Sequence, residues 1–347
     1  MLKIGNIELK PGFIPVQTMI KNPTTDVELT LQKIQRLSQI GCDIIRITVP
    51  DEPAAEAIAR IVRESPIPVV ADIHFDYRLA IKAIEAGVAK VRINPGNIGD
   101  ESRVAAVISC LKEHDIPVRI GINGGSLPKH ITDKISDKCD AMIAAAEEEL
   151  GYFDKYGYDK IVLSFKSSNV LETLKVNRMA TIKFGLPLHI GVTEAGDKFD
   201  GTIKNAVGIS SLLLDGIGST IRVSLTAPEE DEVLTGIKIL ESVGLRKSPL
   251  EIVSCPTCGR TGTNLFEIVH QFKIRSAGVK LTRPVKVAIM GCVVNGPGEA
   301  KDADFGIACG KDKSVIFSEN GSKTVKNEAI LDELLMLLHR YSECILI

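Results

Sequence analysis

The sequence has no tryptophan, and aromatic residues make up only 4% of it. Few side chains are therefore available to stack on the bases of single-stranded nucleic acid. It also has no excess of one charge, because 42 Lys and Arg face 44 Asp and Glu for a formal net charge of -2. No overall field would draw this chain to nucleic acid, so any anion site must be local. We expect no nucleic-acid partner.

Long apolar runs are also missing. No run approaches the ~20 residues that a membrane helix needs, and the first residues, MLKIGN, do not lead into the apolar stretch and cleavage site of a signal peptide. We expect no membrane partner and a cytoplasmic location. In that reducing compartment the eight cysteines are not expected to form disulfides, so their spacing matters more than their number. Four single cysteines are expected to be buried and inert: Cys42, Cys110, Cys139 and Cys344.

Short apolar runs rich in Val and Ile recur along the first two thirds of the chain, separated by longer segments with helical periodicity. This alternation indicates repeated strand–helix units and a parallel sheet. The eight runs are Phe13–Met19, Asp43–Val49, Pro68–Ile73, Lys90–Asn94, Pro117–Asn123, Lys160–Phe165, Pro187–Val192 and Gly218–Ser224. Their number and spacing predict a TIM (β/α)8 barrel over residues 1–243, with a doubly wound open sheet as the alternative fold.

A linker over residues 244–249 precedes a change of composition. Residues 250–347 contain one strand–loop–helix unit, three further strands and a final helix that begins near Glu328. The whole chain is therefore predicted to be an α/β protein, with an N-terminal TIM barrel followed by a small α+β domain.

Three cysteines of this second domain have the spacing of a metal site. Cys255 and Cys258 share a Cys-x-x-Cys turn, and Cys292 follows a predicted strand 34 positions later. A Cys-x-x-Cys pair is compatible with zinc, with a redox disulfide or with an iron–sulfur cluster. A zinc site would take Cys309 as its fourth ligand, whereas Glu299, at the end of the Gly-rich segment 293–299, could fold back onto a metal as an exchangeable oxygen ligand. Spacing leaves this choice open.

Cations lie in or beside strands of otherwise apolar character. In a barrel the carboxyl ends of the strands and the loops that follow them form the active site, so these side chains are expected to converge. Five like charges in a low-dielectric site require an anionic ligand, and a di- or polyphosphate is the natural candidate. The predicted phosphate-binding residues are Arg46, Arg92, Asn94, Arg119, Asn123, Lys166, Arg222 and Ser224.

Acid–base candidates accompany these cations. Glu194 directly follows the seventh strand, in a loop that is otherwise small and polar, and Asp72 and His74 end the third. Each could instead make only a structural hydrogen bond or cap a helix. Glu194 is the residue that we expect to move a proton during catalysis.

A series of longer motifs resembles one known family over nearly the whole chain. They are Val16-Gln17-Thr18-Met19, Arg46-Ile47-Thr48-Val49, Arg92-Ile93-Asn94-Pro95-Gly96-Asn97, Arg119-Ile120-Gly121-Ile122-Asn123-Gly124-Gly125-Ser126-Leu127, Thr193-Glu194-Ala195-Gly196, Asp215-Gly216-Ile217-Gly218, Ile221-Arg222-Val223-Ser224-Leu225-Thr226, Cys255-Pro256-Thr257-Cys258-Gly259-Arg260 and Asn295-Gly296-Pro297-Gly298-Glu299. In this order they are similar to the 4-hydroxy-3-methylbut-2-enyl diphosphate synthases, in the two-domain bacterial form. The chain departs from the usual family residues at Thr18, Ser219 and Cys309, where Ser, Asp and Gly are common.

The resemblance implies a barrel followed by an iron–sulfur domain whose 4Fe-4S cluster is held by Cys255, Cys258, Cys292 and Glu299. It implies a head-to-tail homodimer, in which the cluster domain of one subunit covers the barrel mouth of the other. The implied reaction is the reductive ring opening and dehydration of 2-C-methyl-D-erythritol 2,4-cyclodiphosphate to (E)-4-hydroxy-3-methylbut-2-enyl diphosphate, with two electrons from reduced flavodoxin or ferredoxin. Without the resemblance, two other functions fit the residues: a zinc-containing barrel enzyme that acts on a sugar phosphate, and a cluster-bearing electron carrier or redox sensor.

Overall fold

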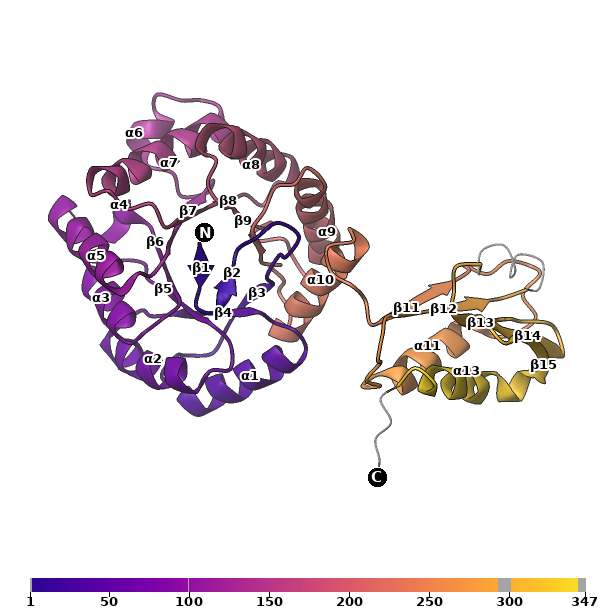
Figure 1. The fold of residues 1–347 in the computed structure, drawn as a ribbon. Helices are drawn as coiled ribbons and strands as arrows, with labels where there is room; N and C mark the ends of the chain where they lie inside the picture. Colours follow the sequence, from indigo (N-terminus) through magenta and orange to yellow (C-terminus); the bar gives the residue numbers. More distant parts are fainter. Residues whose placement is uncertain (1, 99, 293–300, 343–347) are drawn as a thin grey trace. The chain divides into compact units, whose positions relative to one another are not determined.

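The computed structural model describes residues 2–98, 100–292 and 301–342. The chain forms two compact units, Met1–Arg246 and Lys247–Ile347 (Figure 1). The first unit contains β1 (Lys3–Ile4), β2 (Ile7–Glu8), β3 (Gln17–Met19), α1 (Val27–Gln39), β4 (Ile44–Thr48), α2 (Glu52–Glu64), β5 (Val69–Asp72), α3 (Tyr77–Glu85), β6 (Lys90–Ile93), α4 (Pro95–Ile98), α5 (Glu101–His114), β7 (Val118–Asn123), α6 (Lys129–Thr132), α7 (Lys138–Lys155), β8 (Ile161–Lys166), α8 (Val170–Phe184), β9 (His189–Ile190), α9 (Lys198–Leu214), β10 (Thr220–Ile221) and α10 (Glu229–Ser242).

The strands of this unit close into a barrel with the helices around it (Figure 1). Strands β3 to β8 form a parallel sheet in chain order, and β9 pairs in parallel with β10. A parallel bridge between Leu163 and Leu188 joins β8 to the segment of β9, and a second between Val16 and Ile221 joins β10 back to the segment of β3. The predicted TIM barrel is therefore confirmed, and the open doubly wound sheet is wrong.

The helices of the barrel begin where their sequences supply a cap. Asp or Asn precedes α1, α2, α3, α5, α7, α8 and α9, and its side chain accepts a hydrogen bond from a backbone N–H of the first turn. Each such cap is worth about 1 kcal/mol. In α2, Ile58 and Ile61 share a fully buried face with Ala54 and Ala55, and each buried Ile contributes roughly 1.5 to 3 kcal/mol. The caps therefore determine where the helices begin, and the apolar faces determine which side of each helix packs against the barrel.

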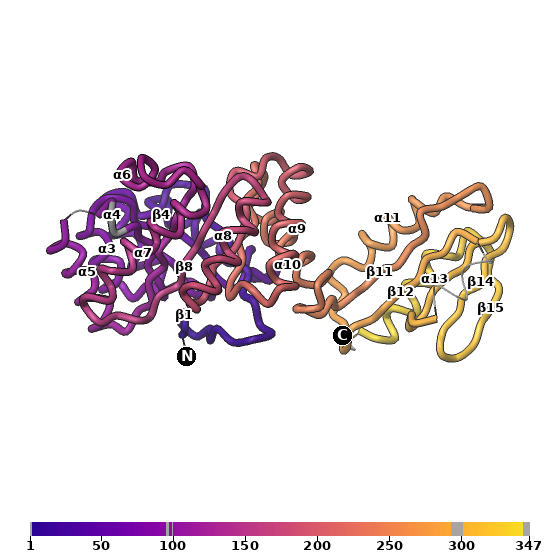
Figure 2. Tube along the Cα trace, turned by 90° about the horizontal axis from the view of Figure 1, so that it is seen from above, coloured from indigo at the N-terminus to yellow at the C-terminus, as the bar shows by residue number. Residues whose placement is uncertain are grey.

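The hairpin of β1 and β2 closes the amino-terminal end of the barrel. Ile4 and Leu9 are buried against Ile44, Val70 and Val162, which lie at the beginnings of their strands. Figure 2 places β1 and α6 on opposite sides of the barrel. The sequence analysis did not predict this hairpin, because two-residue strands are too short to show periodicity. With this end covered, the carboxyl ends of the strands form the open mouth.

The second unit is a five-stranded sheet with helices on one face, as Figure 1 shows. Its strands follow the order β11-β12-β13-β14-β15, parallel up to β13 and antiparallel beyond it. Its core joins the sheet to α11 and α13 through residues such as Phe272, Phe305 and Leu334. Its elements are β11 (Leu250–Ser254), α11 (Leu265–Ser276), β12 (Val285–Met290), β13 (Phe305–Ala308), β14 (Lys313–Ser318), β15 (Gly321–Lys326), the 3-10 helix η1 (Asn327–Ala329) and α13 (Ile330–His339).

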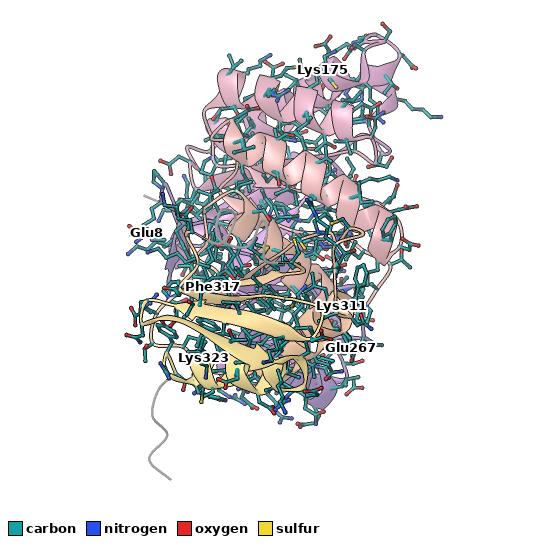
Figure 3. All side chains as sticks on the ribbon, turned by 90° about the vertical axis from the view of Figure 1, so that its right-hand side faces the viewer. Glu8, Lys175, Glu267, Lys311, Phe317 and Lys323 are labelled. Carbon is teal, nitrogen blue, oxygen red and sulfur yellow. The ribbon has the colours of Figure 1, made fainter. Side chains whose placement is uncertain are left out.

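Strand β15 is the element of this unit that the sequence analysis missed. It forms a hairpin with β14, on which Figure 3 labels Phe317, while Lys323 is labelled on β15. Val325 is the one large apolar side chain among its six residues, and the other five are exposed, so no strand pattern is visible in the sequence. In the described ranges 2–98, 100–292 and 301–342, no helix combines the length and apolar character required to cross a membrane.

Candidate active site

A cavity of about 210 Å³ lies at the mouth of the barrel and brings together eight of the residues predicted from the sequence. These eight are Arg46, Asp72, His74, Arg92, Arg119, Asn123, Lys166 and Arg222, and the lining is completed by Met19, Gly121, Ser164 and Thr193. Asn94, Ser224 and Glu194 do not line the cavity, although Glu194 directly follows Thr193, which does. Side chains from the segments of eight strands thus converge on one small space, and seven of these segments contribute a polar side chain.

Strand register explains this convergence. Side chains two residues apart on a strand face the same side, so Arg119, Gly121 and Asn123 of β7 all face the cavity. Arg92 of β6 lies beside Arg119, and Asn123 lies beside Lys166 of β8. Gly121 leaves the space that Arg92 occupies, because a Cβ at this position would come within 3.2 Å of the Arg92 Nε atom.

Asp72 is the carboxylate within this group of cations. Its Oδ1 lies 3.2 Å from Nη1 of Arg92, and its Oδ2 lies 3.5 Å from Nε of Arg46. Burial acts to raise the pKa of Asp72, but the charges of Arg46, Arg92 and Arg119 outweigh it and hold the pKa below its usual value. Asp72 therefore stays ionised and holds two guanidinium groups in place.

The cavity is short of negative charge. Among the described residues, buried nitrogens with no hydrogen-bond partner include Nε of Arg92 and Arg222 and both Nε and Nη1 of Arg119, while Nε of Arg46 has only its ion pair with Asp72. Burial, reinforced by the neighbouring cations, lowers the pKa of Lys166 and of Arg119 well below their usual values, and burial lowers the pKa of Arg46 to about 10. Leaving a buried charged donor unpaired is costly, so the site is built to receive an anion.

A polar layer inside the barrel escaped the sequence analysis. Lys90, Gln17 and His189 are fully or almost fully buried, and Lys90 Nζ, both polar atoms of Gln17 and His189 Nε2 have no partner within the described part of the chain. Burial, together with the charges of Arg119 and Arg46, lowers the pKa of Lys90 well below its usual value. The sequence does indicate where the Lys90 side chain points, because Lys90 precedes Arg92 by two residues and so faces the same side of β6.

Glu194 occupies an unusual backbone conformation at the end of the β9 segment. Its φ of 50° lies in the left-handed region, which a non-glycine residue rarely adopts and which costs of order 1 to 3 kcal/mol. The loop is held in place by Ala195, which is buried, and by the Gly196 carbonyl, which accepts a hydrogen bond from Thr226 N. Its side chain is exposed at the rim. Strain of this kind is typical of functional positions.

In the second unit, neighbouring strands bring two of the three predicted cysteine ligands to one sheet edge, and Cys258 lies in the turn that follows β11. Cys255 directly follows β11, Cys292 comes two residues after β12, and these strands are parallel neighbours. Gly291 N donates a hydrogen bond to Cys255 Sγ over 3.2 Å. Hydrogen bonds from the backbone and side chain of Arg260 lower the pKa of Cys258, and the charge of Cys292 helps to raise the pKa of Arg260. Thiolates that receive N–H donors and face a cation form a donor set that fits an iron–sulfur cluster.

The other cysteines differ from these three. Cys42, Cys110, Cys139 and Cys309 are buried, whereas Cys258 is exposed and Cys255 and Cys292 are partly so. Burial raises the pKa of Cys42 to about 12 and also raises the pKa of Cys309. Within residues 2–98, 100–292 and 301–342, no three His, Cys, Asp or Glu side chains are close enough to hold a single metal ion. Glu299 and Cys344 lie outside the described residues.

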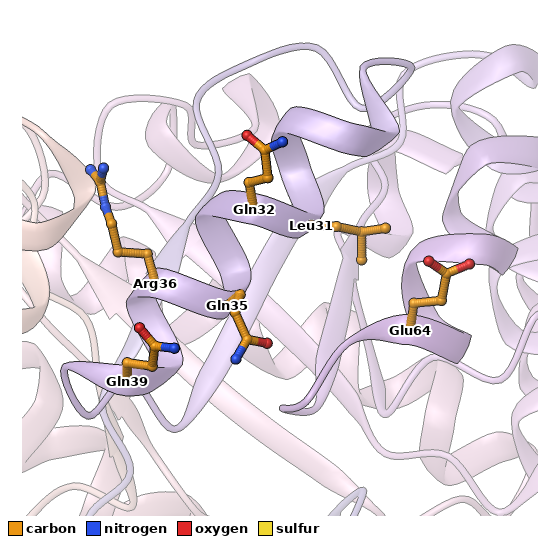
Figure 4. Close-up of a pocket in the computed structure, with 6 residues that line it drawn as sticks. All are labelled: Leu31, Gln32, Gln35, Arg36, Gln39 and Glu64. Carbon is orange, nitrogen blue, oxygen red and sulfur yellow. The ribbon is translucent and has the colours of Figure 1, made fainter.

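A larger hollow of about 500 Å³ lies on the outside of the barrel, over α1 and the end of α2. Figure 4 shows its lining side chains diverging, with Gln32, Gln35, Arg36 and Gln39 on α1 and Glu64 on α2. A binding site needs polar groups that converge on a ligand. We assign this hollow no function.

Both units of the chain match domains of one known protein family. Residues 2–237 match the GcpE TIM-barrel domain, and residues 251–340 match the GcpE protein C-terminal domain. The chain is 49% identical to the 4-hydroxy-3-methylbut-2-en-1-yl diphosphate synthase (flavodoxin) of Caldanaerobacter subterraneus, over 96% of this chain and 94% of the relative. It is 47% identical to the synthase of the same name from Clostridium perfringens, over 97% of both chains.

Solved structures add evidence on the fold alone. The dihydropteroate synthase of Stenotrophomonas maltophilia aligns with a TM-score of 0.52 at 13% identity, over 70% of this chain and 96% of that one. The dihydropteroate synthase of Thermus thermophilus gives the same TM-score, 0.52, at 12% identity, over 70% of this chain and 98% of that one.

Proposed function

Because the chain belongs to the family of 4-hydroxy-3-methylbut-2-en-1-yl diphosphate synthases, we propose how its own residues carry out the family reaction. The enzyme is an iron–sulfur oxidoreductase that converts 2-C-methyl-D-erythritol 2,4-cyclodiphosphate to 4-hydroxy-3-methylbut-2-enyl diphosphate in isoprenoid precursor synthesis. The single observation that carries our account is the set of buried guanidinium nitrogens in the barrel mouth that have no hydrogen-bond partner among the described residues. Neither the zinc enzyme nor the electron carrier is favoured by these relatives.

The barrel residues bind and orient the substrate. Arg92, Arg119 and Arg222 would donate to the diphosphate oxygens the N–H groups that have no hydrogen-bond partner among the described residues. Arg46 and Lys166 would add further positive charge. Asn123 would contribute at the turn that follows β7, where Ser126 N already donates to the Asn123 carbonyl. Asn94 and Ser224 would act at the rim, and His74 from the cavity wall. Asp72 keeps Arg46 and Arg92 aimed at the substrate.

The cluster domain would hold a 4Fe-4S centre through Cys255, Cys258, Cys292 and Glu299. When bound, such a centre delivers electrons one at a time and offers a Lewis-acidic iron. An exchangeable carboxylate suits this purpose better than a fourth thiolate. The burial of Cys309 supports leaving it out of the ligand set.

Glu194 would transfer a proton to the departing hydroxyl, since the reaction expels an oxygen of the substrate as water. A carboxylate at the rim, next to Thr193 of the cavity wall, has the access to solvent that a recharging proton donor needs. Its strained backbone supports a functional reason for its position.

Reduced flavodoxin is the electron donor that the names of the relatives support, and ferredoxin would serve by the same chemistry. We propose the cytoplasm as the site of the reaction. The seven cysteines of the described residues are all free thiols, which fits that reducing compartment.

A head-to-tail homodimer would bring the cluster domain of one protomer over the barrel mouth of its partner. An apolar stripe on the outer face of α9 supports a second copy of the chain as partner. Phe199, Ile203, Val207 and Leu214 are 72%, 50%, 51% and 72% exposed, and they follow one another at helical spacing. Exposed apolar patches of this kind mark interfaces.

Placing two charges on this stripe, with Phe199→Glu and Ile203→Glu together, should yield a monomer. Turnover should then fall at least tenfold, while pyrophosphate binding to the barrel is retained, because the cavity residues are all within one chain. Sedimentation velocity and calorimetry check the two parts. Leu29→Glu, on α1 and 38% exposed, is the control and should stay dimeric. A double variant that remains dimeric, or a wild type that is monomeric, would contradict the stripe as an interface.

Lys166→Met should weaken binding of the cyclic diphosphate by about 1.5 to 3 kcal/mol, the value of one charge-assisted hydrogen bond. Methionine retains the length and the apolar stem of the lysine, which is almost fully buried. The control is Lys175→Met, because Lys175 lies on the outer face of α8 in an exposed ion pair with Asp137. Equal affinity in the Lys166 variant and in the control would exclude a phosphate contact.

The lowered pKa of Lys166 also predicts how the binding of an anion such as pyrophosphate depends on pH. Burial and the cations Arg119, Arg222, Arg46 and Arg92 lower the pKa of Lys166 in the free protein, and a bound anion must raise it. Binding therefore takes up a proton between these two pKa values, and affinity falls as the pH rises through that interval. Calorimetry with pyrophosphate in buffers of different ionisation enthalpy measures the uptake. The Lys166→Met variant should take up less, and an uptake equal to that of the wild type would contradict this assignment.

The reaction itself is tested by incubating anaerobically reconstituted protein with the cyclic diphosphate and a chemical reductant. We expect 4-hydroxy-3-methylbut-2-enyl diphosphate as the product, identified by NMR. Protein that binds about four irons yet leaves the cyclic diphosphate intact would refute the proposal.

A further inference from the structure

A buried acid, Glu232, lies beside the cavity in contact with Arg222. It lies in the first turn of α10, and its side chain is 0% exposed. It accepts a hydrogen bond from Thr18 Oγ1 over 2.6 Å and from Leu225 N over 3.1 Å. Arg222 Nη2 lies 3.1 Å from Oε1 and 3.3 Å from Oε2 of the same carboxylate. Lys21 Nζ adds an ion pair over 3.3 Å.

These contacts are strong for physical reasons. A fully buried carboxylate persists only where several donors surround it, and here β3, the chain after β3 and the chain after β10 each contribute one or more. The amino-terminal end of α10 adds the favourable potential of the helix. Arg222, in contrast, faces other cations across the cavity. Without Glu232, repulsion from Arg46, Arg119 and Lys166 would favour turning its guanidinium out of the cavity.

The contact also leaves part of Arg222 available. Glu232 occupies Nη2 of the guanidinium, while Nε is buried and has no partner among the described residues. Arg222 belongs to the cavity lining, so its unpartnered edge belongs to the anion site. A planar guanidinium held at one corner presents its remaining donors in a fixed direction.

We propose that Glu232 is a positioning residue for substrate binding, which holds the Arg222 guanidinium so that its free donors face the diphosphate. Thr18, through its hydroxyl hydrogen bond, fixes Glu232 in turn. The inference rests on the proposed function, because it takes the cavity as the diphosphate site. Asp72 has the same relation to Arg46 and Arg92, so each side of the cavity has one acid that orients the cations there.

The alternative is that Glu232 only stabilises the barrel where β10 meets β3. Glu229 provides a matched control, since it lies one turn earlier on α10 and is also buried. Its Oε1 accepts hydrogen bonds from Lys33 Nζ over 2.9 Å and from Lys21 N over 3.1 Å, and in the described part of the chain it pairs with no cation of the cavity. A purely structural role predicts similar consequences at the two positions.

Electrostatics separates two effects of replacing Glu232 on anion binding. Removing a negative charge beside an anion site, by itself, strengthens anion binding. Losing the orientation of Arg222 weakens it. The two effects have opposite signs, so a decrease in affinity identifies positioning.

The experiment compares Glu232→Ala, Glu232→Gln and Glu229→Gln with the wild type. The measurements are KM and kcat for the cyclic diphosphate, the Kd of pyrophosphate by calorimetry, and the melting temperature. We expect Glu232→Ala to raise KM and Kd at least tenfold with a smaller change in kcat. Glu232→Gln, which retains one acceptor oxygen, should show an intermediate increase, and Glu229→Gln should stay within about twofold. If the Ala variant does not fold, the Gln variant carries the test.

A double-mutant cycle separates the two roles. In an Arg222→Met background, Glu232→Gln should no longer raise KM, because the group that Glu232 orients is gone and only the loss of a negative charge remains. Tighter or unchanged binding in the Glu232 variants, or the same loss of affinity with and without Arg222, would overturn the proposal. Failure of the proposed function looks different: the wild type itself would bind neither pyrophosphate nor the cyclic diphosphate.

Discussion

Cys258→Ala should yield a folded protein that has lost its cluster and shows no detectable turnover. Cys258 is exposed, follows β11 by four residues and contacts Arg260, so its replacement leaves both apolar cores intact. A cluster deprived of one of its cysteine ligands is not retained. Iron and sulfide analysis, the visible absorption of the anaerobic protein and the melting temperature of the apoprotein measure the three parts of this result.

Cys309→Ala is the control for this prediction. Cys309 lies at the same end of the sheet, directly after β13, but is buried in the core of the second unit. We expect this variant to keep its iron and its activity, with at most a modest loss of stability from the small cavity left by the sulfur. Full iron content in Cys258→Ala together with loss of iron in Cys309→Ala would exchange the roles that we give to these two thiols.

Glu194→Gln should lower kcat by about 10² to 10⁴, the range typical of a lost general acid. The amide keeps the size of the side chain and cannot release a proton, so KM and the spectrum of the cluster should not change. Asp200→Asn, an exposed acid on the adjoining turn of α9, should have wild-type kcat. Activity of the Glu194→Gln variant equal to that of this control would remove Glu194 from the mechanism.

Backbone strain gives a second test of the same residue. Glycine adopts the left-handed region at little cost, so Glu194→Gly should relieve the strain of the φ of 50°. We expect a melting temperature at or above that of the wild type in a protein with greatly reduced turnover. A residue that loses activity and gains stability when replaced is held in place for function.

The barrel was predictable because its signal is local and repeated. Each strand is an apolar run, and each of seven helices begins at an Asp or Asn cap that the sequence displays. The site followed from one rule, that strand ends meet at the mouth of a barrel. Arg119, Asn123 and Lys166 could therefore be grouped from the sequence, and the structure brings them to one cavity.

What the sequence could not reveal depends on contacts between distant residues. Glu232 and Thr18 are 214 positions apart, and nothing in the helix around Glu232 distinguishes it from the three acids beside it. Lys90 is the first residue of its predicted strand, where a Lys side chain is usually expected to be exposed, yet it is fully buried. The hairpin β1–β2 consists of strands too short for any period to be seen. Such features can be recognised only in the folded structure.

The central claim is that a diphosphate held by the barrel reaches an iron–sulfur cluster of the second domain. The most direct measurement is the electron paramagnetic resonance spectrum of anaerobic, reduced protein before and after addition of the cyclic diphosphate. We predict an iron–sulfur signal that changes when the substrate is added to the wild type and changes only at much higher substrate concentration in Lys166→Met. A wild-type signal that stays the same at saturating substrate, or a colourless protein that contains zinc, would contradict the claim.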